Sequence, residues 1–332
     1  MTNPSPSTQP ELTYAGERYY HHTGRAPLFG TTLATITAWA AAVALAIAYA
    51  WVDLNVKVAD LVSAFIVIAF AVAGGFAVYA VMRWAKVRNM PVIVIVAVSA
   101  ALLLFYASWA VWEADLSRQA SRPISAWRLS QRPGLMWRYA LRINEVGTFT
   151  LNDRAVTGGE LWAFWIGEAF LLIGATIAIP IAMMRGQAFC ENCGAWCKRN
   201  KDIARVQNFD DELVREHMEE KDFEYLVRLG PATINTPVHL RVELLSCPKC
   251  KQTHLLTVNR INIQYVNGRR AENAKPVVDR LWLDAAQAEM VRGLPKMLSA
   301  VAAEAETAKK QAAAEPASET QTQSPAPDQG SP

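Results

Sequence analysis

Residues 189–197 read Phe-Cys-Glu-Asn-Cys-Gly-Ala-Trp-Cys, and residues 247–250 read Cys-Pro-Lys-Cys. Each stretch contains a CxxC pair, in which a tight turn points two thiolates toward the same metal ion. Two such pairs complete a closed tetrahedral site of four thiolates, which is typical of structural zinc. We therefore expect one Zn²⁺ to be bound by the four cysteines of the two pairs, Cys190, Cys193, Cys247 and Cys250.

The number and spacing of the cysteines leave other interpretations open. The two pairs are 53 residues apart, whereas about 15–20 residues is usual, so an insertion must loop out between them. Cys197 is a fifth thiol, interpreted as a spare buried cysteine, an alternative metal ligand or a redox thiol. His254 offers a ligand in place of a thiol, although a surface histidine is favoured. A thioredoxin-like CxxC would need a surrounding βαβ pattern, which the sequence does not have.

Four long apolar runs precede the first CxxC pair. Residues 26–52, 61–82 and 89–112 contain no charged side chain, and Leu161–Met184 contains only Glu168. About 20 residues of helix cross a hydrocarbon core of about 30 Å, so each run is long enough. Tryptophans lie mostly toward the ends of the runs, as in an interfacial aromatic belt. We expect four transmembrane helices, the first of them an uncleaved anchor.

Glu168 stands about two helical turns inside the fourth run. A carboxylate in hydrocarbon costs about 2.5–3.5 kcal/mol, so such a residue normally faces a partner or water. One interpretation is an intramembrane ion or proton site. The alternatives are that the helix begins only near Glu168, or that Glu168 pairs with an arginine of the preceding loop.

Charges in the loops predict the orientation. The loop between the second and third runs contains Arg83, Lys86 and Arg88 and no acid, and the positive-inside rule places it in the cytoplasm. Both termini are then cytoplasmic. Loop 113–160 would face outward although it contains seven arginines, and loops of this length follow the rule less strictly.

A periodic segment lies within that loop. Apolar residues recur at spacings of three and four over Leu135–Val146, directly after Pro133-Gly134. This period predicts an amphipathic helix. We expect it either to lie in the membrane interface with Trp137 as an anchor or to cap the helix bundle.

The part of the chain after the fourth run is predicted to be a small α+β domain of the zinc-ribbon type. Alternating apolar residues predict strands over His239–Leu244 and over 256–265, with a bulge near Asn259-Arg260. Asn267-Gly268 predicts a hairpin turn. The second CxxC pair would then lie at the tip of a hairpin, as a zinc knuckle requires.

The whole chain is thus predicted as a membrane α-helical domain of four transmembrane helices followed by a small cytoplasmic α+β domain. Helices are also expected over Asp211–Leu229 and Asp284–Glu306. The end segments contain few large apolar residues and are expected to be disordered. The predicted boundaries are a polar tail over 1–25, the transmembrane domain over 26–184, the cytoplasmic domain over 185–308 and a second tail over 309–332.

Composition and motifs favour a binding protein over an enzyme. The net charge is only +3, so the sequence does not require a polyanionic partner, and it contains no catalytic constellation. We expect an integral membrane protein that presents a structural-zinc module to a cytoplasmic protein partner. Assembly into a homo-oligomer is an open alternative. One alternative is a transporter or channel subunit that uses Glu168. Another is contact with nucleic acid or lipid head groups through a locally basic hairpin containing Arg241, Lys249, Lys251, Arg260, Arg269 and Arg270.

Three segments resemble a family of bacterial four-helix inner-membrane proteins that ends in a CxxC…CxxC domain of the zinc-ribbon type. They are the basic loop Arg83–Asn89, the Asn-Glu-Val-Gly-Thr segment Asn144–Thr148 and the Phe-Cys-x-x-Cys-Gly-x-Trp-Cys motif Phe189–Cys197. The resemblance covers roughly residues 26–200. It implies the architecture and a bacterial inner-membrane location, but the family supplies no activity.

Overall fold

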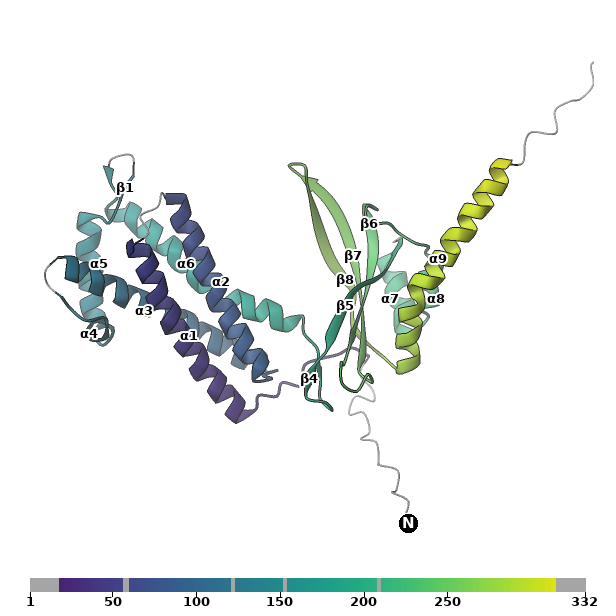
Figure 1. Ribbon diagram of the computed structural model, residues 1–332, viewed down its shortest axis with the longest axis horizontal. Helices are drawn as coiled ribbons and strands as arrows, with labels where there is room; N and C mark the ends of the chain where they lie inside the picture. Colours follow the sequence, from purple (N-terminus) through teal and green to yellow (C-terminus); the bar gives the residue numbers. More distant parts are fainter. Residues whose placement is uncertain (1–17, 56–59, 121–122, 152–153, 208–209, 315–332) are drawn as a thin grey trace, which may run out of the picture. The chain divides into compact units, whose positions relative to one another are not determined.

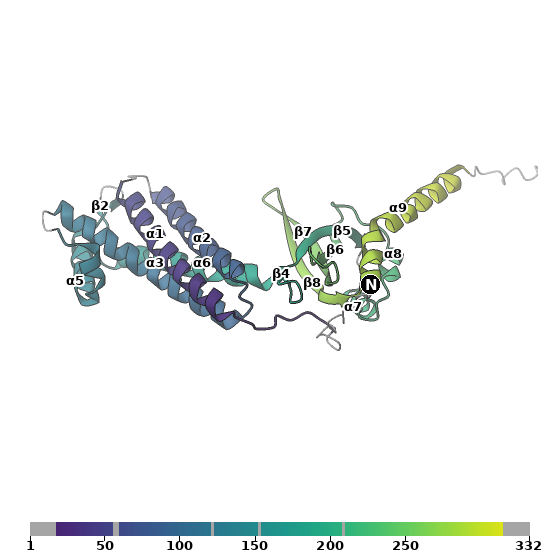
Figure 2. The same ribbon diagram turned by 60° about the horizontal axis from the view of Figure 1, so that its bottom comes forward.

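The computed structural model of the protein describes residues 18–55, 60–120, 123–151, 154–207 and 210–314. The chain forms two compact units. The described residues between 22 and 187 form the first, which we name the helical unit. The described residues between 188 and 314, together with residues 18–21, form the second, which we name the sheet unit. Figures 1 and 2 show the long helices of the first unit and the strands of the second.

The helical unit contains four helices that are long and apolar enough to cross a membrane. They are α1 (Leu28–Asn55), α2 (Asp60–Trp84), α3 (Met90–Gln119) and α6 (Gly158–Arg185). Asn89 caps the N-terminus of α3, because its side chain accepts a hydrogen bond from the Val92 N–H at 3.1 Å. The helix continues past the predicted end at Trp112 to Gln119, since no residue there interrupts a helix.

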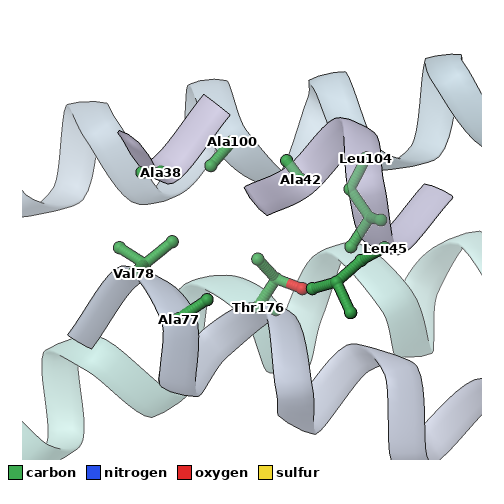
Figure 3. Close-up of a pocket in the computed structure, with 9 residues that line it drawn as sticks. Ala38, Ala42, Leu45, Ala77, Val78, Ala100, Leu104 and Thr176 are labelled. Atoms are coloured by element: carbon green, nitrogen blue, oxygen red, sulfur yellow. The ribbon is translucent and has the colours of Figure 1, made fainter. Parts of the chain in front are cut away.

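Small side chains let these helices approach closely. A Cβ on Gly74 would lie 3.0 Å from Thr176 Oγ1 and 3.1 Å from Leu104 Cδ2, so only glycine fits there without a shift. The space at this junction is too small for a water molecule (Figure 3). It is lined by Ala38, Ala42, Leu45, Gly74, Ala77, Val78, Ala100, Leu104 and Thr176.

The segment between α3 and α6 folds against the bundle. It forms α4 (Ala126–Ser130), α5 (Pro133–Val146) and a small hairpin of β1 (Thr150–Leu151) and β2 (Arg154–Ala155). The predicted amphipathic helix is confirmed as α5. Met136 packs with Ala110 and Ala114 of α3, so one face of α5 caps the bundle. In the last turn of α5, Asn144 is buried and Val146 is exposed, whereas the apolar period predicts Val146 on the buried face. The reason is that the Asn144 amide donates a hydrogen bond to the Gly158 carbonyl at 2.9 Å.

The sheet unit is built on four antiparallel strands in the order β5-β6-β7-β8. They are β5 (Lys198–Gln207), β6 (Val238–Ser246), β7 (His254–Val266) and β8 (Arg269–Leu283). The predicted strands lie within β6 and β7. Asn267 and Gly268 have φ of +51° and +74°, so the predicted tight turn is confirmed. The register of β7 against β8 shifts between Leu256 and Asn259, next to the predicted bulge.

Three helices pack against this sheet, namely α7 (Asp211–Glu219), α8 (Glu224–Arg228) and α9 (Ala285–Ala314). Their apolar residues, among them Val214, Leu226 and Leu294, form one core with alternate residues of the strands. Figure 2 shows α7, α8 and α9 beside the strands. β5, β6 and β7 contribute side chains to this core at every second position, as period-two alternation requires. β8 contributes the adjacent Val277 and Val278, where its register against β7 shifts.

Two predictions about helices of this unit were wrong. The single helix over 211–229 is two helices, because Lys221 has a left-handed φ of +66° and the Asp222 carboxylate then caps the Tyr225 N–H at 3.3 Å. The last helix continues through 309–314, within the predicted tail, because this stretch is rich in alanine and lysine. The predictions for 1–17 and 315–332 lie outside the described residues.

The N-terminal tail does not extend to residue 25 as expected, because two tyrosines join the sheet unit. Tyr19 forms a β-bridge with Leu281, and the Tyr20 N–H donates to the Arg280 carbonyl at 2.9 Å. Tyr20 is only 2% exposed. Burial of a large aromatic side chain supplies the stabilisation that a purely polar tail would lack.

Candidate metal centre

Two hairpins carry the CxxC pairs. β3 (Phe189–Cys190) pairs with β4 (Ala195–Trp196), and the turn between them contains Cys193 and a left-handed Gly194 with φ of +59°. The second pair occupies the connection between β6 and β7, where the Cys247 N–H donates to the Thr253 carbonyl at 3.0 Å. The second CxxC therefore lies at the tip of a hairpin, as the alternation of its flanking residues predicted.

The thiols of these two hairpins converge on one point. Cys190, Cys193, Cys247 and Cys250 have sulfur atoms that all lie within 4.8 Å of one another. The sulfurs of Cys190 and Cys250 are 3.7 Å apart. Zinc bound to four thiolates at about 2.3 Å holds its ligand sulfurs about 3.8 Å apart in a tetrahedron. The four side chains thus fit a single ion of this size and coordination number.

The thiols differ in their affinity for protons. Burial opposes ionisation of Cys250, but hydrogen bonds from the Gln252 and Thr253 backbone and from neighbouring thiols lower the pKa of Cys250 to about 6. Hydrogen bonding to Cys250, followed by burial, raises the pKa of Cys193 to about 12. Burial raises the pKa of Cys190. The lowered pKa of Cys250 favours its thiolate, which is the form that binds a metal ion.

Residues around the cysteines fix their orientation. The Thr253 hydroxyl donates to Cys190 Sγ at 3.2 Å, which is the kind of contact that orients a metal ligand. His254 is 1% exposed rather than a surface residue. Its Nε2 donates to the Lys251 carbonyl at 2.7 Å, and its Nδ1 accepts from Ser246 at 2.9 Å. Both ring nitrogens are engaged in these bonds, so His254 supports the hairpin instead of replacing a thiol.

Cys197 lies beside the four thiols but is not one of the convergent group. Its N–H donates to the Ala188 carbonyl at 2.8 Å, which joins it to the start of the first hairpin. The side chain is 6% exposed. Burial, together with the neighbouring thiols, raises the pKa of Cys197 to about 12. These features match a buried structural thiol better than a reactive one.

Tyr20 is a part of the centre that the sequence patterns did not indicate. It packs in one apolar cluster with Cys190, Cys197 and Cys247. The Phe189 N–H donates to its hydroxyl at 2.9 Å, and its ring lies 5.8 Å from that of Trp282. The one available signal was a pair of adjacent tyrosines in an otherwise polar stretch.

Glu168 and a second acid occupy the helical unit. Glu168 lies well inside α6, which begins at Gly158, and it accepts a short hydrogen bond from the Tyr49 hydroxyl. The alternative of a later helix start is therefore wrong, and the partner of Glu168 among the described residues is Tyr49. Glu113 is 1% exposed, and neither of its carboxylate oxygens has a hydrogen-bond partner among the described residues. Sequence reasoning missed it because the third run was ended at Trp112.

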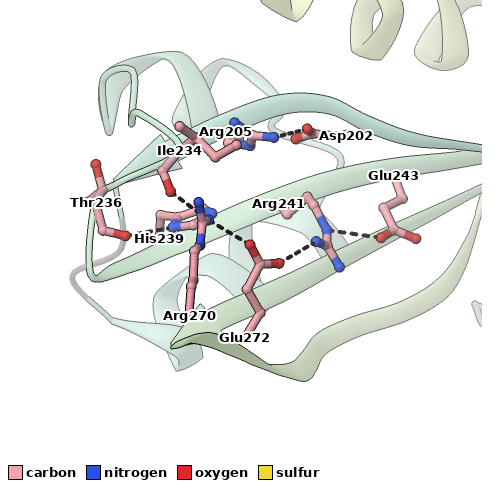
Figure 4. Close-up of polar contacts among 9 residues, drawn as sticks. All are labelled: Asp202, Arg205, Ile234, Thr236, His239, Arg241, Glu243, Arg270 and Glu272. Atoms are coloured by element: carbon pink, nitrogen blue, oxygen red, sulfur yellow. Dashed lines mark hydrogen bonds and ion pairs between the residues drawn. The ribbon is translucent and has the colours of Figure 1, made fainter. Parts of the chain in front are cut away.

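Three of the six basic residues named for the second hairpin form ion pairs with acids. Glu272 accepts from Arg270 at 2.6 Å and from Arg241 at 3.4 Å, and Arg241 also donates to the buried Glu243 at 3.2 Å (Figure 4). Arg260 pairs with Asp211 at 3.0 Å. A continuous basic surface for nucleic acid would need these guanidinium groups to be unpaired.

Comparisons with protein-family models, with curated proteins and with solved structures found no match to this chain. The centre is therefore assigned from its own residues. Four thiols that converge at the tips of two hairpins can hold one metal ion, and four apolar helices can hold the chain in a membrane.

Proposed function

We propose that this chain is an integral membrane protein whose sheet unit is a zinc-ribbon-like module for docking a protein partner. The convergence of the four thiols within 4.8 Å carries the proposal. Four thiolates fill the tetrahedral coordination of Zn²⁺ and leave no open position for a substrate, which assigns a structural role to the ion. The described residues near the centre include one Ser–His contact, between Ser246 and His254 at 2.9 Å. His254 is 1% exposed and its other ring nitrogen is bonded to the Lys251 carbonyl, so we assign this contact to the support of the hairpin and do not propose an enzyme.

The ion would cross-link the two hairpins. Each strand of the β3–β4 hairpin is two residues long, and a hairpin of this size is not stable alone in water. Cys190 and Cys193 would hold it to the tip of the β6–β7 hairpin through the metal. Bound zinc supplies this cross-link, while Thr253 orients Cys190 and Tyr20 excludes water from one side.

We infer a bacterial inner-membrane location with both termini in the cytoplasm. Arg83, Lys86 and Arg88 stand near the connection between α2 and α3, which supports a cytoplasmic location for that end of the bundle. Fusions of alkaline phosphatase and of green fluorescent protein to the C-terminus test the orientation. Fluorescence without phosphatase activity is expected, and the reverse pattern contradicts the inferred topology.

The tip of the β7–β8 hairpin is the proposed contact surface. β6 begins at Val238, which pairs with Asn262, so β7 beyond Ile263 pairs only with β8. The two strands project there as a ribbon (Figure 1). Tyr265 is 69% exposed and Val266 is 56% exposed, beside Arg269. Exposed tyrosine and arginine next to apolar area are typical of protein-binding hot spots.

Site-specific photo-cross-linking tests this function. A benzophenone amino acid replaces Tyr265 in the full-length protein in native membranes, and Thr307 on the exposed part of α9 is the control position. A cross-link to a defined protein from position 265, absent from position 307 and weakened by added unlabelled protein, is expected. Equal labelling from both positions, or labelling of lipid alone, contradicts a protein-docking tip.

Use of Glu168 in a transporter or channel subunit stays an alternative prediction. Glu168→Gln removes the charge and keeps the shape of the side chain. Loss of ion flux in this variant, at an unchanged zinc content, would favour transport over docking. Unchanged ion flux in this variant would leave the sheet unit as the functional part of the protein.

A further inference from the structure

The outer face of α4 and α5 combines exposed tryptophan with exposed arginine. Trp127 is 73% exposed and Trp137 is 55% exposed. Arg128, Arg132 and Arg138 are exposed beside them. This outer face is distinct from the buried stripe of α5 that contains Met136 and packs on α3. A surface helix with large apolar side chains among cations is typical of binding at a membrane interface.

The three arginines of the outer face have no ion-pair partner among the described residues, whereas their neighbours do. Arg118 pairs with Asp115 at 3.7 Å, Arg142 with Glu145 at 3.2 Å and Arg154 with Glu160 at 2.7 Å. These three acids are thus already paired with other arginines. The outer face keeps three uncompensated positive charges, which fit an anionic partner.

Further tryptophans indicate the level in the bilayer at which this outer face lies. The rings of Trp109 and Trp162 lie 5.0 Å and 5.1 Å from that of Trp165. Trp137 of α5 continues the cluster, with its ring 5.3 Å from that of Trp162. Tryptophans gather at the level of the lipid head groups. The cluster therefore places α5 at that level rather than in the hydrocarbon core or in bulk water.

We propose that the outer face of α4 and α5 binds the phosphate groups of anionic phospholipids at one surface of the bilayer. Arg128, Arg132 and Arg138 would hold lipid phosphates through paired N–H donors, since guanidinium matches phosphate geometry. Trp127 and Trp137 would rest between the head groups and the acyl chains. The proposal depends on the membrane-spanning part of the proposed function and is independent of the metal centre.

Lipid titration of the purified full-length protein in detergent, followed by native mass spectrometry, tests this proposal. Phosphatidylglycerol is compared with phosphatidylcholine in wild type and in the triple variant R128Q/R132Q/R138Q. The matched control is R118Q/R142Q/R154Q, which removes the same number of charges from ion-paired positions. A single arginine near an anionic surface is worth about fivefold in affinity, so the triple variant should lose roughly a hundredfold for phosphatidylglycerol. The control should lose far less.

Further arms separate the alternatives. R128K/R132K/R138K keeps the charge and should keep most of the affinity, which guards against a folding defect. Equal phosphatidylglycerol affinity in the triple variant and the control would overturn the proposal. Competition by inorganic phosphate as strong as that by lipid would assign the arginines to a free anion and also overturn it. Extraction of the protein by alkaline carbonate would instead show that the membrane-spanning assignment had failed.

Discussion

Replacing Cys247 by serine removes one corner of the thiol cluster, and the structure sets the size of the expected effect. A metal that joins Cys193 to Cys247 closes a loop with 53 intervening residues. The chain entropy removed from the unfolded state by closing such a loop corresponds to about 4 kcal/mol. For a unit of this size that is a decrease of roughly 10 °C in the midpoint of thermal unfolding.

The matched control is Cys197→Ser, because Cys197 is equally buried but outside the convergent group. Zinc per chain is measured by elemental analysis of protein prepared without chelator. We expect about one zinc in wild type and in Cys197→Ser, and none in Cys247→Ser. Hydrogen exchange then localises the effect, and the amides of 189–197 should lose protection in Cys247→Ser.

Three results would contradict this reasoning. A wild-type protein that contains no metal would contradict the zinc site and favour a redox interpretation of the cysteines. A full zinc content in Cys247→Ser, lost instead in Cys197→Ser, would mean that the ligand set is wrong. A loss of zinc with unchanged thermal stability would keep the site but contradict its structural role.

Three further outcomes are expected. Because Cys190 and Cys193 have raised pKa values and must release protons to bind metal, zinc affinity should increase about a hundredfold from pH 7 to pH 8, measured by chelator competition. Gly75→Ala should destabilise the helical unit by about 1–3 kcal/mol in a thermal unfolding assay, since the new Cβ would lie 2.8 Å from a side chain of α6. Gly167→Ala is the control and should be neutral in the same assay, because a Cβ at position 167 would meet nothing within 4 Å. Glu113→Leu should raise the unfolding midpoint, because it removes a buried carboxylate without a hydrogen-bond partner at a cost of about 1–3 kcal/mol.

The parts of the fold that sequence predicted are those fixed by local chemistry. The absence of charge over about 20 residues is enough to find a helix that can cross a membrane, and Asn267-Gly268 is enough to find a tight turn. The CxxC spacing brings two thiols together by itself. The meeting of the two pairs also followed, because the strand pattern placed the second pair at a hairpin tip.

The missed features depend on contacts between distant segments. Tyr20 is 169 residues from Phe189, to which it is hydrogen-bonded, and no periodic pattern indicates such a pairing. The break between α7 and α8 occurs at Lys221, which is left-handed although it is not glycine. The pattern of charged residues continues across this position and does not predict the break. Glu113 lies beyond the apolar run that predicts the third helix, because that run ends at the first charged residue, whereas a helix accepts glutamate readily.

The position of the cysteines within the sheet unit argues for a particular role of the metal. The main core of this unit, which includes Val242, Leu256 and Leu294, is separate from the cluster that contains the cysteines. Removal of the ion should therefore lower the stability of that core by the lost loop closure without removing any of its own contacts. The cysteine cluster also joins Tyr20, which precedes α1 in the chain, to Phe189, which follows α6. Zinc would therefore hold the Tyr20 segment and the β3–β4 hairpin to the tip of the β6–β7 hairpin, in addition to closing the loop.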